Sequence, residues 1–140
     1  MGKYNELTKY LNYIDDDNFG EWVIDNKNEG TIDNPIQMPF VSYSKMIIDF
    51  EKDIYKFVEA NPNLELKRYS GILESHGIKW SSESMEEADL TNVDERCVLA
   101  LLLGIVRADR MCEGTLLSFF KNGSIKRWLS YLREIDENRC

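Results

Sequence analysis

Four charged side chains at the end of an apolar segment are the residues best able to do chemistry in this sequence. They are Arg107, Asp109, Arg110 and Glu113, and they directly follow the apolar residues 98–106. Guanidinium groups bind carboxylates or phosphates, and paired carboxylates can exchange protons. Because no nucleophile, phosphate-binding loop or metal-ligand set accompanies them, the sequence leaves open whether the chain is an enzyme.

The spacing of this charged cluster supports two interpretations. A helix through the cluster turns Asp109 toward the main apolar face and puts Arg107 and Arg110 on a second apolar face. Charges buried there need partners, so they either form an internal ion network or line a pocket for a small anionic or zwitterionic ligand. In the second case Trp22 and Tyr43 are candidates for the walls of the pocket.

The cysteines and the histidine give no indication of a metal site. The chain has three cysteines, Cys97, Cys112 and Cys140, and a single histidine, His76. The cysteine spacings are not those of a metal-binding pair, and the helical projection places Cys112 in the buried stripe. We therefore expect reduced, structural cysteines, no metal and no cofactor.

The composition is that of an ordinary folded protein. Of its 140 residues, 43% are hydrophobic and 30% are charged, and this length is typical of one domain with its own core. The net charge of −8 disfavours direct nucleic-acid binding and binding to anionic membranes. The apolar segments are too short to span a bilayer, and the first residues lack the apolar core of a signal peptide. We expect a single cytoplasmic domain covering residues 1–140.

Most of the chain has the pattern of amphipathic helices. One helix is expected to begin after Ser44 and to end at Asn61, and the longest to begin after Asn92 or Asp94 and to end near Met111. Shorter helices are predicted around residues 7–14, 66–76, 114–120 and 125–132, with an acidic run at residues 15–18 ending the first of them.

A hairpin and a polar connection interrupt the helices. Residues 21–24 and 36–43 favour strands, residues 28–30 favour a turn, and Pro39 marks an edge or irregular strand. Residues 80–92 are polar and acidic, which predicts a solvated connection that can contain one helical turn. The expected fold class is mainly α, a compact helical domain around a buried central helix with a small β-hairpin.

Two sequence blocks resemble an uncharacterised bacterial family without a known function. Residues 105–114, IVRADRMCEG, are similar to the family pattern V-R-A-D/E-R-F-C-E/D-G and depart from it at Met111; Asn122, Gly123 and a leucine- and arginine-rich helix follow. Residues 37–44, QMPFVSYS, are similar to its segment M-P-Y-V-x-Y-S. The resemblance spans residues 19–133 and implies a single domain, but it implies no reaction.

Two classes of function follow from these observations. A binding or interaction module would present its acidic surface, or the aromatic side chains of Phe119, Phe120 and Trp128, to a protein partner or to a second copy in a homodimer. The spacing of these aromatic residues, however, favours the core. The alternative is a small-molecule sensor or enzyme with its pocket at the charged cluster.

Overall fold

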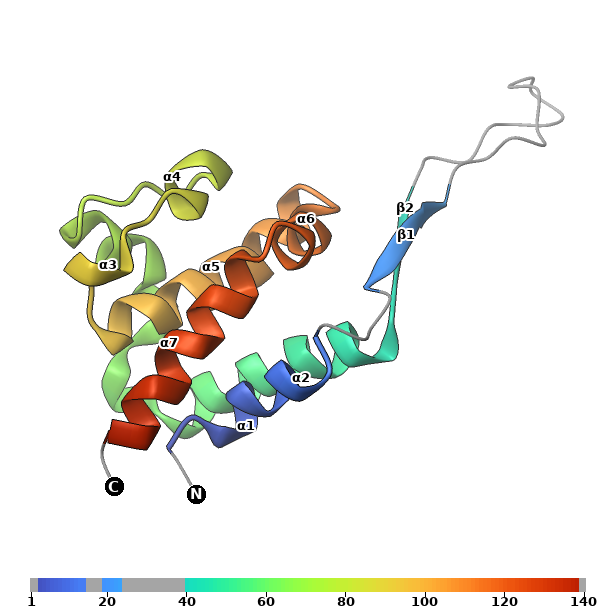
Figure 1. The fold of residues 1–140 in the computed structure, drawn as a ribbon. Coiled ribbons are helices and arrows are strands. Elements are labelled where there is room, and N and C mark those ends of the chain that lie inside the picture. Colours follow the sequence, from blue (N-terminus) through green and yellow to red (C-terminus); the bar gives the residue numbers. More distant parts are fainter. Residues whose placement is uncertain (1–2, 15–18, 24–39, 139–140) are drawn as a thin grey trace, which may run out of the picture.

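The structure, a computed structural model, describes residues 3–14, 19–23 and 40–138. Within these ranges the fold is mainly α with one small antiparallel sheet, as predicted. Figure 1 shows the helices gathered into one body, from which the hairpin projects. The acidic run at 15–18, the turn at 28–30, Pro39 and the rest of 36–39, and Cys140 lie outside the described residues.

The central helix is α5, Glu95–Met111. It begins at Asp94, whose Oδ1 accepts a 2.9 Å hydrogen bond from the backbone N–H of Cys97 and so caps the helix. All residues from 97 to 106 are buried, which confirms the predicted central helix. The helices packed against it are α2 (Lys45–Ala60), α3 (Tyr69–Ser75), α6 (Thr115–Lys121) and α7 (Ser124–Asn138).

The first helical segment is shorter than predicted. It consists of α1, Asn5–Thr8, and the 3-10 helix η1, Lys9–Asn12, and its predicted apolar residues Leu7, Tyr10 and Ile14 are buried. This segment and the end of α7 lie side by side (Figure 1), and the N–H of Tyr4 donates a 2.9 Å hydrogen bond to Asp136 Oδ2. The two ends of the described chain are thereby joined.

Local sequence signals set the bounds of α2 and α3. Ser44 Oγ accepts from the N–H of Ile47 at the start of α2, and α2 ends before Asn61 and Pro62. Two 3-10 helices, η2 (Pro62–Leu64) and η3 (Leu66–Arg68), lead into α3, which ends at Ser75, with His76 as the C-cap next to the predicted end.

The connection between α3 and α5 is more ordered and more buried than the sequence suggested. It contains α4, Ser82–Glu86, and the 3-10 helix η4, Leu90–Asn92. Met85 is only 1% exposed and Ala88 only 5% exposed, so the prediction of a solvated connection is wrong at these positions. Met85 packs on α5 at Gly104, where an added Cβ would lie 2.9 Å from Met85 Cε. The glycine thus makes room for an apolar side chain from an otherwise polar segment.

The aromatic residues considered as a partner surface belong to the core. Phe119, Phe120 and Trp128 are all buried. Phe120 packs edge-on against Phe50 of α2, and Phe119 packs against Trp128, with ring centroids 5.2 and 5.7 Å apart. These three side chains therefore stabilise the packing of α6 on α2 and α7, and they are not available to a partner.

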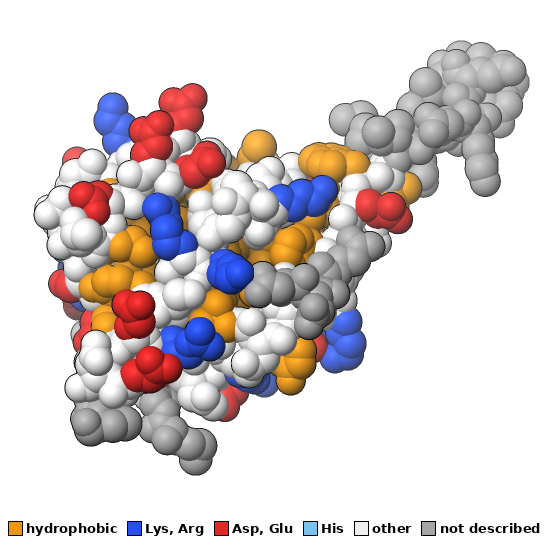
Figure 2. All heavy atoms as spheres, in the orientation of Figure 1, with side chains coloured by type: hydrophobic (Ala, Val, Ile, Leu, Met, Phe, Trp, Pro, Cys, Tyr) orange, Lys and Arg blue, Asp and Glu red, His pale blue; other side chains and the backbone are white. Residues whose placement is uncertain are grey.

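The hairpin pairs β1, Gly20–Val23, with β2, Phe40–Tyr43, in the register Gly20↔Tyr43 and Val23↔Phe40. Its residues are mostly exposed, and Figure 2 shows orange side chains where the hairpin leaves the body, while red and blue ones are interspersed elsewhere on this face. An isolated two-stranded sheet is at best marginally stable in water, so contacts with the body must hold it.

Among the described helices, none combines the length and hydrophobicity that a membrane crossing requires.

Candidate functional site

Asp109 joins the hairpin to the turn between α5 and α6. Its Oδ1 accepts hydrogen bonds from Tyr43 Oη at 2.6 Å and from the backbone N–H groups of Gly114 and Leu116, both at 3.1 Å. The sequence predicted that this carboxylate needs a partner, and the structure supplies three. Two of them are the otherwise unbonded N–H groups at the start of α6, so Asp109 also stabilises that helix end.

Glu113 and Trp22 complete the same junction. Glu113 Oε2 accepts a 2.6 Å hydrogen bond from the N–H of Val41 in β2. Gly114 has a φ of +96°, and a Cβ built on it would lie 2.4 Å from Cζ2 of Trp22. The indole ring therefore lies directly on the glycine backbone. Four of the six predicted site residues, Trp22, Tyr43, Asp109 and Glu113, thus meet at one place, where they anchor the hairpin.

The two arginines do not join this junction. Arg107 and Arg110 are exposed, contrary to the expectation that a helix buried on two sides turns them inward. The reason is that burial of α5 ends at Val106, so its last turn emerges from the body. Across the described part of the chain, neither arginine forms an ion pair with Asp109 or Glu113, and the predicted internal ion network is not formed there.

Cys112 is also exposed, which corrects its predicted place in the buried stripe. Helix α5 ends at Met111, and Cys112 has extended backbone angles, so the helical projection no longer applies to it. Cys97 is buried, and this burial raises the pKa of its thiol to about 11. The Cys97 thiol therefore stays protonated at neutral pH and is a poor nucleophile.

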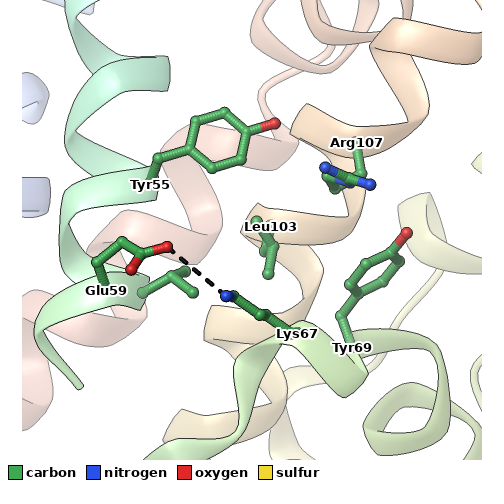
Figure 3. Close-up of a pocket in the computed structure, with 7 residues that line it drawn as sticks. Tyr55, Glu59, Lys67, Tyr69, Leu103 and Arg107 are labelled. Atoms are coloured by element: carbon green, nitrogen blue, oxygen red, sulfur yellow. Dashed lines mark ion pairs between the residues drawn. The ribbon is translucent and has the colours of Figure 1, made fainter. Parts of the chain in front are cut away.

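Arg107 lines a cleft of about 340 Å³ between α2, η3, α3 and α5. Figure 3 shows Tyr55 and Tyr69 on either side of it, Leu103 between them, and Arg107 at one end. At the other end Lys67 Nζ lies 3.7 Å from Glu59 Oε1. The full lining consists of Tyr55, Val58, Glu59, Lys67, Tyr69, Leu103 and Arg107.

The guanidinium at the Arg107 end of the cleft is exposed. The hydroxyls of Tyr69 and Tyr55 lie beside the guanidinium and raise the pKa of Arg107. Tyr55 Oη is buried, yet among the described residues it makes no hydrogen bond. Arg107 likewise forms no ion pair within the described ranges. The exposed guanidinium therefore has no carboxylate partner among the described residues, and its N–H groups can bind an anion.

Neighbouring side chains hold both tyrosines in place. The guanidinium of Arg110 lies over the ring of Tyr55, 5.8 Å from its centroid. Trp80 packs edge-on against Tyr69 with centroids 5.3 Å apart, and its Nε1 donates a 3.0 Å hydrogen bond to the carbonyl of Gly104. The two walls of the cleft are therefore positioned before any ligand binds.

Of the residues predicted for the site, the cleft contains only Arg107. Sequence reasoning missed Tyr55, Glu59, Lys67 and Tyr69, which come from two segments separated along the chain. The available signal was that Tyr55 and Tyr69 border the apolar stripes of two helices that pack on α5. The cleft offers cations and hydroxyl groups, and the described residues contain no group of three His, Cys, Asp or Glu side chains able to hold a metal ion.

The hydroxyl of Tyr43 makes the hairpin junction sensitive to alkaline pH. Burial, and then the hydrogen bond to Asp109, raise the pKa of Tyr43 above its ordinary value of 10. Because the folded state keeps this phenol protonated, its contribution to stability is complete below a pH of about 10 and is lost as the pH rises further. We expect the unfolding free energy of the wild type to fall more steeply than that of Tyr43→Phe as the pH rises from about 10 to about 12. Equal slopes in urea denaturation across this range would contradict the assignment.

Comparison with known proteins gives a family but no activity. The model of a protein family of unknown function matches residues 69–138. The matched segment contains the first of the two blocks noted in the sequence, residues 105–114, and not the second. No curated protein and no solved structure matches the chain.

Proposed function

This chain belongs to DUF6508, a family of unknown function, and from that premise we propose that it is a binding protein for a small anionic molecule. The ligand would occupy the cleft between α2, α3 and α5 with its carboxylate or phosphate group on Arg107. This assignment keeps Arg107 as a binding residue and gives Asp109, Glu113, Trp22 and Tyr43 the structural role of anchoring the hairpin. Arg110 contributes indirectly, because its guanidinium lies over the ring of Tyr55 and holds that wall of the cleft in place.

The observation that carries the proposal is the set of donors around Arg107. An exposed guanidinium, the buried hydroxyl of Tyr55 and the hydroxyl of Tyr69 converge at one end of a cleft with an apolar floor. A planar guanidinium binds carboxylate or phosphate through two parallel hydrogen bonds, and a neighbouring hydroxyl such as that of Tyr69 can donate to the same group. The buried side chains Leu103 and Val58 suit an apolar body attached to it.

Local charge decides whether an anion can enter, despite a net charge of −8 for the whole chain. Charges beyond roughly 8 Å of the cleft are largely screened at physiological ionic strength. Within the lining, Arg107 and Lys67 face a single carboxylate, Glu59, which is already near Lys67. The cleft is therefore a locally cationic site on an acidic protein.

The first experiment is calorimetric titration of the protein with hexanoate, benzoate and inorganic phosphate. We expect at least one of them to bind, and we expect Arg107→Gln to weaken that binding by at least about tenfold, because the charge-assisted pair is lost. The unfolding free energy of Arg107→Gln should equal that of the wild type, since the side chain is exposed.

The matched control is Arg133→Gln, which removes an exposed arginine of α7 that does not line the cleft. It lowers the net charge equally and should leave binding unchanged. Equal weakening by both substitutions would show a general charge effect and contradict the site. Absence of binding for all three anions would contradict the function.

A further inference from the structure

The cleft continues into a second hollow beyond the Glu59 and Lys67 pair. This second hollow has a volume of about 280 Å³ and is lined by Pro62, Glu65, Leu66 and Arg68 as well as by residues of the first. The lining residues common to both hollows are Val58, Glu59 and Lys67. The two hollows are thus neighbours that meet at one ion pair, which joins the end of α2 to η3.

The Lys67–Glu59 ion pair separates the two hollows only weakly. Lys67 Nζ and Glu59 Oε1 are 3.7 Å apart, and the two side chains are 78% and 73% exposed. Exposed pairs at such a separation contribute little to stability, because water screens them and both flexible side chains lose freedom when they pair. Either side chain can therefore rotate away at small cost, and beneath the pair Val58 provides a continuous apolar floor.

We propose that this groove binds linear dianions, with one anionic group on Arg107 and the other on Lys67 after Lys67 turns away from Glu59. The proposal rests on the anion-binding function of Arg107 and adds to it the class of ligand. The two cations lie on either side of Leu103 (Figure 3), so the ligand between them would be an apolar chain with a charge at each end.

Three features of the lining favour linear dianions over monoanions and over branched molecules. First, a monoanion on Arg107 leaves Lys67 with only its weak exposed partner. Second, the surface between the two cations is apolar and mostly buried, formed by Leu103 at 3% and Val58 at 8% exposure. Third, Tyr55 and Tyr69 flank this surface and limit the width available to a branched or bulky molecule.

The test is a calorimetric comparison of dicarboxylates with monocarboxylates of equal chain length. The pairs are succinate and butanoate, adipate and hexanoate, suberate and octanoate, and sebacate and decanoate. We expect one dicarboxylate to bind at least about tenfold more tightly than its monocarboxylate, because a second charge-assisted contact forms only when the chain spans the groove. The monocarboxylates should show only the gradual gain from added apolar length.

Two variants test whether the tighter binding of the dicarboxylate depends on the Lys67–Glu59 pair. Lys67→Gln should abolish the advantage of the dicarboxylate, so that it binds no more tightly than the monocarboxylate of equal length. Glu59→Gln should increase the advantage, because Lys67 then has no competing carboxylate in the cleft. The control Lys52→Gln removes an exposed lysine of α2 outside both hollows and should change neither affinity.

The outcomes separate this proposal from the function on which it rests. Monocarboxylates that bind through Arg107, with no dicarboxylate binding better, would overturn the dianion proposal alone. A dicarboxylate advantage that survives in Lys67→Gln would overturn it as well. If neither the monocarboxylates nor the dicarboxylates bind in a way that depends on Arg107, both proposals are overturned.

Discussion

Replacing Asp109 with alanine lowers the free energy of unfolding by about 3 kcal/mol or more, in our expectation, because it removes three hydrogen bonds at once. The carboxylate accepts from Tyr43 Oη and from the N–H groups of Gly114 and Leu116. The start of α6 is buried, so these two N–H groups cannot simply turn to water. Urea denaturation of the purified variant measures the loss.

Two comparisons show whether the hydrogen bonds are the cause. Asp109→Asn keeps an acceptor oxygen in place and should cost only about a third as much as Asp109→Ala. Arg110→Met changes an exposed neighbour on the same helix and should leave stability nearly unchanged. A loss below about 1 kcal/mol for Asp109→Ala would mean that the hairpin junction contributes little to the fold.

Gly114→Ala is the second substitution for which we expect a large effect, also about 3 kcal/mol. The residue has a φ of +96°, a conformation that costs an L residue about 1 kcal/mol or more. In addition, its Cβ would lie 2.4 Å from the Trp22 ring, so the indole has to leave its place on the glycine and the contact between the hairpin and the turn before α6 is lost. Loss of this contact also disturbs the hydrogen bonds of Asp109, which share the same turn.

Gly123 supplies a matched control for the backbone contribution. It has a φ of +84°, but nothing lies within 4 Å of a Cβ built on it. Gly123→Ala should therefore cost only about 1 kcal/mol. The double variant Trp22→Ala with Gly114→Ala tests the steric part, since the alanine at 114 should cost much less once the indole is gone. Equal costs at positions 114 and 123 would refute the role of Trp22.

The parts of the fold that depend on local signals could be predicted from the sequence. Ser44 and Asp94 cap α2 and α5 because their side-chain oxygens accept from N–H groups three residues later. The break between α6 and α7 follows in the same way from the Asn122 and Gly123 pair, next to the end of α6. The resemblance to a family without a known function was also confirmed in that general form by the match to residues 69–138.

The candidate site depends on contacts between distant segments, and these could not be predicted. The helical projection placed Cys112 in the core because it assumed a helix that in fact ends at Met111. Met85 can be buried because Gly104 has no side chain to occupy the same space. The residues around Met85 do not reveal this long-range fit. The cleft itself forms only when the packing of α2 and α3 near α5 brings Tyr55 and Tyr69 to opposite sides of Leu103, with Arg107 at one end.

The contact between Trp80 and Tyr69 gives this protein an intrinsic optical reporter. The chain has three tryptophans in three different environments: Trp22 is half-exposed on the hairpin, Trp128 is fully buried in the core, and Trp80 touches a wall of the cleft. The hydrogen bond to Gly104 holds its indole on α5, so we expect its emission to respond when the ring of Tyr69 moves. We therefore expect binding at the proposed anion site to change the fluorescence of Trp80, without a dye attached to the surface.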